Sequence, residues 1–262
     1  MTLAEEESDR SRSFLPIAVT GAALRSLKAS ESVARELVDD IVVGRMCTGD
    51  PLPPEPAMMQ KYGVSRETLR EGLRLLEVQG LISIRRGPGG GPSVGVVDPA
   101  NLGRTSTLYF HVAGTTYAEL FEAWIVCERM LAELAAGNTD RQAVRAVMAP
   151  FIGQYDEGEE TLEDFVVHHM EFHVAVGSLA RNRALQLSLM MMGQIVTHHL
   201  AAHADPRLAR RTIEDAHSAI ARAIVAGHRV KARNLMEAHI RALTEFYQGD
   251  LGPQMSDYVE WR

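Results

Sequence analysis

One short stretch of the chain, residues 81–97, has a pattern that excludes a helix and so divides the rest of the sequence. After Gly80, residues 81–84 read as a short apolar strand, and residues 93–97 read as a second one. The sequence RRGPGGGP lies between them, and its prolines and glycines cannot continue a helix. Strand, glycine-rich tip and strand predict a β-hairpin.

Three helical segments precede this hairpin. They span about residues 30–45, 57–62 and 66–78, and the turn-rich sequence CTGDPLPPEP separates the first two. The third segment has leucines at helical spacing on one face and arginines on the other. Helices followed by a hairpin in this order predict a winged helix-turn-helix over residues 24–97.

Nearly everything after Asp98-Pro99 has helical periodicity, without the alternation of a strand. Helix-start signals such as Thr116-x-x-Glu119 and Asp205-Pro206 support this interpretation. The predicted helices lie near residues 100–112, 116–136, 140–156, 161–180, 183–203, 206–226 and 230–248. We therefore predict a mainly α protein, in which an N-terminal winged helix-turn-helix with a small β-hairpin wing precedes a C-terminal all-α antiparallel helical bundle.

The distribution of charge supports a division into parts with different roles. Residues 24–97 carry a net charge of +1, whereas residues 98–262 carry −6 and all ten histidines. A chain with a net charge of −7 does not coat nucleic acid along its whole length, so any contact with DNA is local. The predicted segments are a disordered tail (1–23), the winged helix-turn-helix (24–97), a linker with the first helix of the bundle (98–115), a helical ligand-sensing domain (116–250) and a C-terminal tail (251–262).

The two cysteines, Cys47 and Cys127, lie far apart and form neither a metal-binding pair nor a disulfide framework. This usage is typical of a reducing compartment. The acidic N-terminus lacks the pattern of a signal peptide, and no stretch approaches the roughly 18 apolar residues of a membrane helix. We expect a cytoplasmic protein that does not enter a membrane.

The third predicted helix has the side chains that a DNA-reading helix needs. Arg66 and Arg70 are four residues apart, hence on one face, where a guanidinium can bind guanine or clamp a phosphate. Ser65 stands at the helix start, which favours anions. In the hairpin, Arg86 and Gly87 can approach the minor groove or flanking phosphates. An arginine-rich face on an isolated helix is often merely exposed to solvent. On a helix that lies between another helix and a wing, the same face favours DNA binding.

The sequence GDPLPPEPAMMQKYGVSRETLREGLRLLEVQGLISIRRGPGGG closely resembles the signature of the GntR family of bacterial regulators, over about residues 30–97. That signature contains Leu-Pro-x-Glu, Val-Ser-Arg, Arg-Glu-x-Leu, Gly-Leu and a wing with Arg-x-Gly. With this resemblance, we assign DNA contacts to Ser65, Arg66, Thr68, Arg70, Arg86 and Gly87. Pro56 departs from the pattern, because the family often has a DNA-contacting Arg there, so a relative's operator cannot be transferred. We expect a homodimer on a palindromic double-stranded DNA operator, because paired half-sites need paired readers.

The C-terminal region resembles the FadR-like branch of the same family, whose effector domain is called FCD. The resemblance rests on ELFEAWIVCERMLAELAA (119–136), EFHVAVGSLARNRAL (171–185) and EDAHSAIARAIVAGHRVKARNLMEAHI (214–240). In that branch an Asp-x-x-x-His and two later histidines hold a metal ion. The resemblance implies a metal site at His173, His217 and His239, with His169 at the position of the Asp.

The histidines can also be judged by their chemistry. His169 and His173 are four residues apart and lie over one helical face, which is good spacing for two ligands. Neutral imidazole suits Zn, Ni, Cu or Fe, and we expect Zn or Ni. Without the Asp, the ion would be more attractive to an anionic effector. The alternative is that these are hydrogen-bonded core histidines. A second group, His198, His199 and His203, favours solvent exposure or pocket lining over metal binding.

The effector is less constrained by the sequence. Many relatives have an Arg four residues before the Glu that matches Glu128, and it binds a carboxylate; this chain has Trp124 there. An indole in place of a cation favours a more apolar effector, acyl or cyclic, or no effector at that site, and a carboxylate stays open. We assign the effector pocket to Trp124, Glu128, Met191 and Asn182, although Trp and Met stripes are usually plain core.

Three classes of function remain to be weighed. The first is a DNA-binding transcriptional regulator controlled by a small-molecule effector, and the second is a metal-dependent enzyme that uses the C-terminal histidines. The sequence has no HExxH, GxSxG or P-loop motif, so we predict that the protein is not an enzyme. The third is an adaptor protein, and that role would not explain why Arg66, Arg70 and Arg86 are present at these positions.

Overall fold

The chain forms two compact units in the computed structural model, one ending at Leu102 and the other beginning at Gly103. The described residues are 28–87, 89–153, 161–200, 205–251 and 255–261. Each unit has its own hydrophobic core. The tail predicted for residues 1–23 lies outside the described residues.

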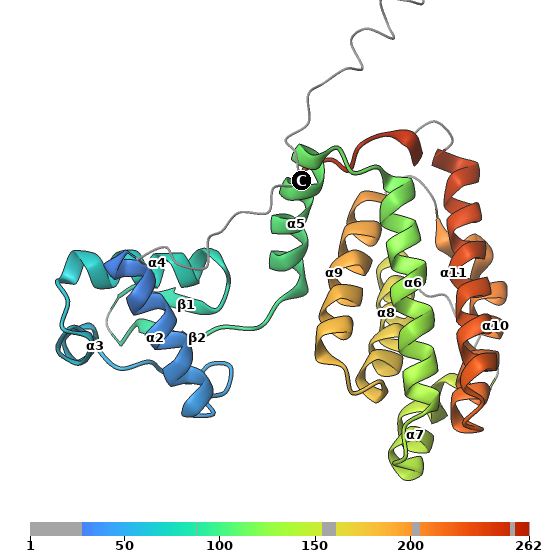
Figure 1. The fold of residues 1–262 in the computed structure, drawn as a ribbon, viewed down its shortest axis with the longest axis horizontal. Coiled ribbons are helices and arrows are strands. Elements are labelled where there is room, and N and C mark those ends of the chain that lie inside the picture. Colours follow the sequence, from blue (N-terminus) through green and yellow to red (C-terminus); the bar gives the residue numbers. More distant parts are fainter. Residues whose placement is uncertain (1–27, 88, 154–160, 201–204, 252–254, 262) are drawn as a thin grey trace, which may run out of the picture. The chain divides into compact units, whose positions relative to one another are not determined.

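The N-terminal unit consists of three helices and a hairpin (Figure 1). Its elements are α2 (Ala29–Val43), α3 (Glu55–Tyr62), α4 (Arg66–Val78), β1 (Ile82–Arg85) and β2 (Gly91–Val94). The buried side chains of its core are Val33, Ala34, Leu37, Leu52, Met58, Leu69, Leu73, Leu76 and Ile82. The predicted helix-turn-helix with its hairpin is therefore confirmed, and α4 has the bounds that the sequence indicated.

Two glycines fix the arrangement of the three helices. Gly63 ends α3 with a φ of 64°, a left-handed conformation that side chains rarely adopt, and so turns the chain into α4. Gly72 faces α2, where an added Cβ would lie 2.9 Å from the carbonyl oxygen of Ser30 and 3.0 Å from Cγ1 of Val33. Helices α2 and α4 therefore approach more closely than any larger residue at position 72 would permit.

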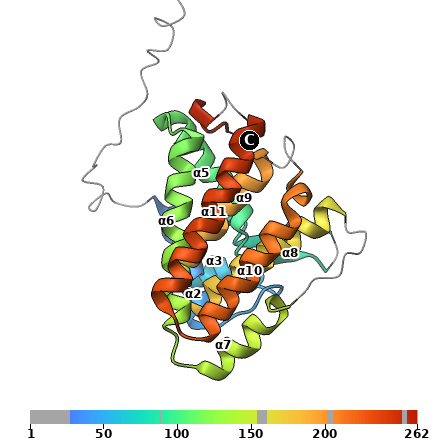
Figure 2. The same cartoon turned by 90° about the vertical axis from the view of Figure 1, so that its right-hand side faces the viewer.

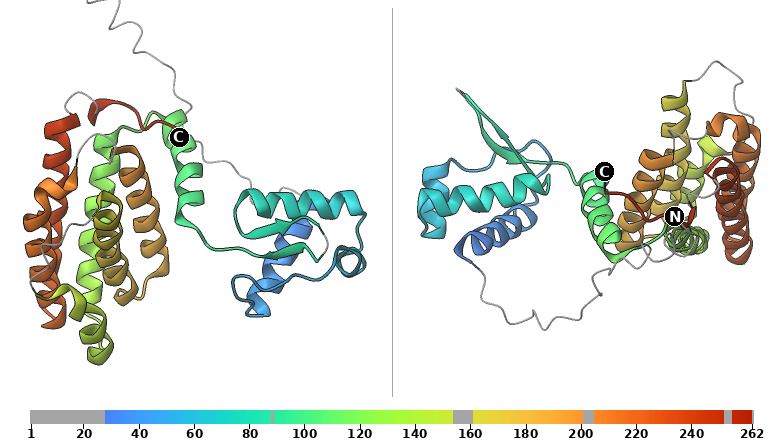
Figure 3. Two further views of the ribbon diagram at one scale, coloured as in Figure 1. Left: turned by 180° about the vertical axis from the view of Figure 1, so that it is seen from behind. Right: turned by 90° about the horizontal axis from the view of Figure 1, so that it is seen from above.

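The hairpin is antiparallel and pairs Ile82 with Val94 and Arg85 with Gly91. The right-hand view of Figure 3 shows the two strands extending together away from the helices. The second strand begins and ends earlier than the 93–97 predicted from the sequence. The reason is a close crossing at Gly95, whose N–H donates to the carbonyl of Leu81 and where a Cβ would meet the backbone at 2.3 Å.

The C-terminal unit is an all-helical bundle, as predicted (Figures 1 and 2). Its helices are α5 (Pro99–Ala113), which begins in the other unit, α6 (Tyr117–Ala136), α7 (Arg141–Met148), α8 (Leu162–Leu179), α9 (Arg183–Leu200), α10 (Arg210–Val225) and α11 (Arg229–Leu251), with short 3-10 turns at Ala149–Phe151 and Pro206–Ala209. Helix α6 is central and packs against α8, α9, α10 and α11. Thr116 begins it with the predicted capping box, in which its hydroxyl accepts the N–H of Glu119.

One predicted helix boundary in this unit was wrong, and the packing of the C-terminal segment was not predicted. The helix expected over 140–156 ends at Met148, because Pro150 lacks the N–H that a helix interior needs and the chain tightens into a 3-10 turn. The C-terminal segment is not a free tail: Met255 and Val259 are buried, and the N–H of Val259 donates to the carbonyl of Thr115 at 2.8 Å. Apolar side chains that the bundle can cover hold this segment in place.

None of the helices in the described ranges combines the length and apolar character that crossing a bilayer requires.

Candidate functional site

The start of α4 and its outer face carry four of the predicted DNA-contacting residues. Ser65 is the N-cap, and its hydroxyl oxygen accepts the N–H of Thr68 at 3.2 Å. Arg66 and Arg70 are exposed one turn apart. An open groove runs along this face, lined by Ala29, Ser30, Arg66, Glu67, Thr68, Arg70, Glu71 and Arg74.

Glu55, the first residue of α3, binds the arginines of α4. The Nε of Arg70 donates to both carboxylate oxygens of Glu55 at 3.2 and 3.3 Å, and the Nε of Arg66 lies 4.0 Å from the same group. Exposed pairs of this kind contribute at most about 1 kcal/mol to stability, so their main effect is to orient the guanidinium groups. Because the contacts of Arg70 use Nε, its terminal N–H groups remain available to a guanine or a phosphate.

Arg86 and Gly87 lie at the exposed tip of the hairpin. Gly87 has a φ of 103°, which side chains rarely adopt, so the tip depends on a glycine there. The absence of a side chain at Gly87 also lets the backbone come close to a partner. The six residues assigned to DNA contact thus occupy one helix face and one hairpin tip, both within the N-terminal unit.

The four histidines predicted from the sequence meet in the helical unit. His169 and His173 come from α8, His217 from α10 and His239 from α11. One ring nitrogen from each lies within 4.8 Å of those of the other three, and the Nε2 atoms of His217 and His239 are 3.1 Å apart. His173, His217 and His239 are buried, whereas His169 is partly exposed.

This donor set fits a transition-metal ion. Two imidazole nitrogens bound at about 2.0–2.1 Å to a tetrahedral ion lie about 3.3 Å apart, close to the separation between His217 and His239. Nδ1 of His169 and Nε2 of His173 are buried without a hydrogen-bond partner in the described part of the chain. Buried polar atoms of this kind are costly unless something binds them, and an ion at the centre of the cluster would do so.

Three of the four imidazoles, those of His169, His217 and His239, favour the uncharged form that binds metals. Burial, and then the neighbouring imidazoles His173 and His239, holds the pKa of His169 well below the ordinary value of 6.5. The same causes, burial first, lower the pKa of His217 and that of His239. Metal binding at neutral pH would therefore require no loss of protons from these three side chains.

Glu128 lies directly behind this cluster. Its side chain is completely buried in α6, and its Oε1 atom lies 2.7 Å from Nδ1 of His173. The indole N–H of Trp124 donates to the same oxygen at 3.2 Å. The sequence assigned Glu128 to the wall of an effector pocket, but the structure puts it against a histidine of the cluster.

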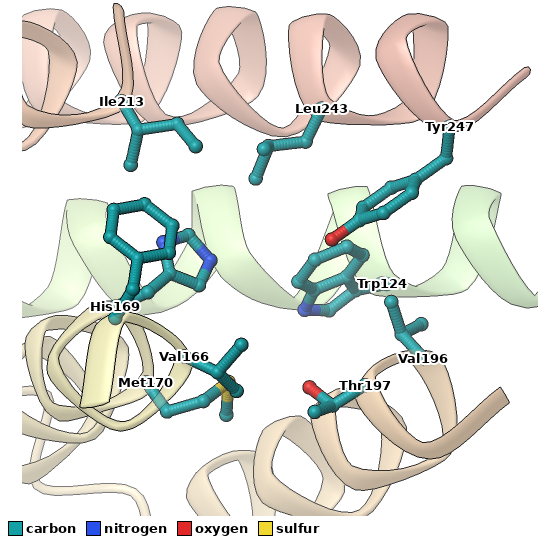
Figure 4. A pocket seen from close by; sticks show the side chains of 11 residues that line it. Trp124, Val166, His169, Met170, Val196, Thr197, Ile213, Leu243 and Tyr247 are labelled. Carbon is teal, nitrogen blue, oxygen red and sulfur yellow. The ribbon is translucent and has the colours of Figure 1, made fainter. Parts of the chain in front are cut away.

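A mostly apolar pocket opens beside the histidine cluster (Figure 4). The cavity is narrow, with a free volume of about 20 Å³ that holds about one water molecule, and side chains from α6, α8, α9, α10 and α11 converge on it. It is lined by Trp124, Phe165, Val166, His169, Met170, Gly193, Val196, Thr197, Ile213, Leu243 and Tyr247. His169 belongs both to this lining and to the histidine cluster.

Of the four residues assigned to an effector pocket, Trp124 alone lines this one. Met191 faces α5, where its sulfur accepts a hydrogen bond from the hydroxyl of Ser106 at 2.9 Å. Asn182 is exposed and caps α9 by accepting the N–H of Leu185. Met and Asn occur in helix–helix contacts and helix caps as well as in pocket walls. The sequence alone therefore did not distinguish these roles.

The second histidine group divides. His199 is buried, and its Nδ1 lies 2.7 Å from the hydroxyl of Tyr117. His198 is exposed, and His203 lies outside the described residues.

Sequence reasoning missed the lining residues of α11. Leu243 and Tyr247 follow His239 at four and eight residues, so all three lie on one face of α11. That spacing, counted onward from His239, was the signal that could have found them.

Two family models match the chain and together cover well over half of it. The model for the bacterial regulatory proteins of the gntR family matches residues 29–90, and the model for the FCD domain matches residues 119–242. The chain belongs to the GntR family of bacterial regulatory proteins and carries an FCD domain. The resemblance found in the sequence is thereby confirmed.

Curated relatives agree with this assignment. The Exu regulon transcriptional regulator of Escherichia coli K12 is 27% identical over 216 residues, covering 80% of this chain and 81% of its own length. The uncharacterized HTH-type transcriptional regulator Rv0494 of Mycobacterium tuberculosis is 32% identical over 139 residues, covering 52% of this chain and 48% of its own. These matches indicate a transcriptional regulator and not an enzyme.

A solved structure has the same fold. The GntR protein of Streptococcus agalactiae superposes with a TM-score of 0.57 at 23% identity, covering 82% of this chain and 99% of that one. The likeness supports the winged helix-turn-helix followed by a helical domain.

Proposed function

We propose that this transcriptional regulator binds a palindromic operator as a homodimer, and that a small effector beside a metal ion in the helical unit changes its affinity for that operator. The observation that carries the proposal is the double position of His169. It is one of four converging histidines and also part of the wall of an apolar pocket. A ligand in that pocket would therefore lie next to the ion.

In this proposal α4 and the hairpin read the DNA. Arg66 and Arg70, oriented by Glu55, would reach base edges or phosphates in the major groove, and Arg86 would reach the backbone or the minor groove. Pro56 supplies no donor at the start of α3. Contacts from one unit cover one half-site, and a second copy would cover the other.

His169, His173, His217 and His239 would hold the ion, with Zn²⁺ or Ni²⁺ as the expected occupants. When bound, the ion supplies a positive charge beside the pocket, and an oxygen or nitrogen of a ligand would bind it as a fifth donor if the shell expands beyond the four imidazoles. The imidazoles supply the donor atoms, and three of the four, those of His173, His217 and His239, are buried away from water.

The pocket lining favours a small ligand with a largely apolar body. Among the described residues that line it, none is Lys, Arg, Asp or Glu, so a ligand with several charges or many hydroxyl groups would leave polar groups unpaired. The polar atoms at the wall come from His169, Thr197, Tyr247 and Trp124, whose indole N–H already donates to Glu128. A single oxygen-containing headgroup toward the ion, with an apolar remainder against Val166 and Leu243, satisfies this lining.

Helix α9 offers a path from the pocket toward the DNA-binding unit. Gly193 and Thr197 line the pocket, while Met191 on the same helix accepts the hydrogen bond of Ser106 in α5. The chain enters α5 directly from the hairpin. A ligand that favours one position of α9 would bias α5 and so shift the population of DNA-binding arrangements.

The test is a fluorescence-anisotropy titration of the protein on duplex DNA from upstream of its own gene, with and without chelator. A screen of candidate effectors then compares apolar monocarboxylates, fatty acids and their thioesters with hydroxy, dicarboxylic and sugar acids. We expect metal-dependent binding of an apolar acid or thioester and a change in operator affinity. Stabilisation by sugar acids alone, or an operator affinity that no metal or ligand alters, would contradict the proposal.

A further inference from the structure

We infer that Glu128 is a positioning residue for the metal site: its carboxylate holds Nδ1 of His173, so that Nε2 of that ring is the atom offered to the ion. The inference rests on the metal site proposed above and concerns a residue outside the four ligands. It also connects that site to the pocket, because Trp124 contacts both.

The first argument is the isolation of the carboxylate. Glu128 is completely buried, and the contacts recorded for it in the described part of the chain are with Trp124 and His173, and with no Lys or Arg. Its second oxygen, Oε2, is buried and has no hydrogen-bond partner among the residues that the structure describes. Burying a carboxyl group in such a place is costly unless polar or positively charged groups offset it. A divalent ion one imidazole away would supply the missing charge.

The second argument is the set of polar contacts open to the His173 ring. Its Nδ1 atom lies 2.7 Å from Oε1 of Glu128, while Nε2 is buried without a hydrogen-bond partner among the described residues. Phe172 and Trp124 contact the ring only through its faces and edges. Glu128 is therefore the polar group that can fix the ring, as a carboxylate commonly does for a metal-bound histidine.

The third argument is the hydrogen bond from the pocket side. The indole of Trp124 lines the pocket and donates its N–H to Oε1 of Glu128 at 3.2 Å. Trp124, Glu128 and His173 thus form a continuous series from the pocket wall to the cluster. A ligand that moves the indole would move the carboxylate that holds the ring.

The experiment measures the affinity of metal-free full-length protein for Zn²⁺ and Co²⁺ by competition with a chromophoric chelator, together with the visible absorption spectrum of bound Co²⁺. Glu128→Gln keeps the shape and removes the charge; Glu122→Gln, an exposed position on the same helix, is the matched control. We expect Glu128→Gln to weaken the affinity by about 10–100-fold and to alter the Co²⁺ spectrum, with Glu122→Gln unchanged. Trp124→Phe removes the indole donor together with part of the ring volume, and we expect a loss of about tenfold or less.

The stability of the metal-free protein separates positioning from a structural role. Since Glu128→Gln keeps the shape of the side chain, we expect the metal-free variant to melt at about the same temperature as the wild type. Equal metal affinity and an equal Co²⁺ spectrum in the wild type, Glu128→Gln and Trp124→Phe would overturn the inference while leaving the metal site intact. A wild type that binds neither ion would overturn the metal site and this inference with it.

Discussion

Adding Zn²⁺ or Ni²⁺ to chelator-treated protein should raise the melting temperature of the helical unit. Four imidazoles converge there from α8, α10 and α11, and an ion that binds them stabilises only the state in which these helices are packed together. At a free ion concentration one hundred times Kd the stabilisation is about 2.7 kcal/mol. For a unit of this size each kcal/mol corresponds to about 2–4 °C, so the expected rise is about 5–10 °C.

Tryptophan fluorescence can report this unit alone. The chain has two tryptophans, Trp124 and Trp261, and both belong to the helical unit. Trp124 is buried in the pocket wall, 6.4 Å from the ring of His173 between centroids, so its emission follows the packing around the cluster. The two units have separate hydrophobic cores, and this probe reports the transition of the helical unit alone.

Two variants make the prediction specific. His239→Asn removes a buried histidine of the cluster and should lose most of the rise, while His198→Asn, at an exposed histidine outside the cluster, should keep it. An absence of any shift with Zn²⁺, Ni²⁺, Co²⁺, Mn²⁺ or Fe²⁺, or the same shift in His239→Asn as in the wild type, would refute the reasoning.

Three further results are expected. In metal-free protein the pKa values of His169, His217 and His239 are lowered, so below about pH 6.5 the unfolded chain binds more protons than the folded one. The free energy of unfolding should therefore fall as the pH drops through this range, by up to about 1.4 kcal/mol per pH unit for each histidine. Urea unfolding at pH 5.5–8 measures this change, and a flat profile contradicts it. Gly72→Ala should cost about 1–3 kcal/mol by forcing α2 from α4, seen as a lower melting temperature by circular dichroism and weaker DNA binding; an unchanged melting temperature would show that the helices can separate freely. Val259→Ala should destabilise the helical unit by about 1–3 kcal/mol in the same fluorescence assay, whereas a free tail would tolerate it without change.

The helices were predictable because their signals are local. The leucines of α4 repeat at helical spacing between the cap Ser65 and the glycine that follows, and the predicted bounds of that helix were correct. Boundaries failed where one residue or a distant contact decides them. Pro150 ends α7 early, and Gly95 shortens β2 because it crosses the backbone near Gly80.

The histidine cluster was predictable in its members but not in its surroundings. His169 and His173 are a turn apart in sequence, and the resemblance to a known family supplied the other two. Glu128 comes from a different helix, and no spacing in the sequence relates it to His173. The packing of the C-terminal segment was not predicted for the same reason, because Val259 contacts Thr115, which lies far away in the sequence.

The measurement that tests the account most directly is the binding of the wild type and of Arg70→Ala to duplexes from upstream of the gene and to shuffled duplexes of equal length, at several salt concentrations. The account predicts that the wild type prefers a palindromic upstream site and that Arg70→Ala weakens this binding by about 5- to 150-fold, with Arg145→Ala in α7 as an unaffected control. Equal affinity of the wild type for both kinds of duplex at low salt, in metal-loaded and metal-free protein alike, would contradict the account.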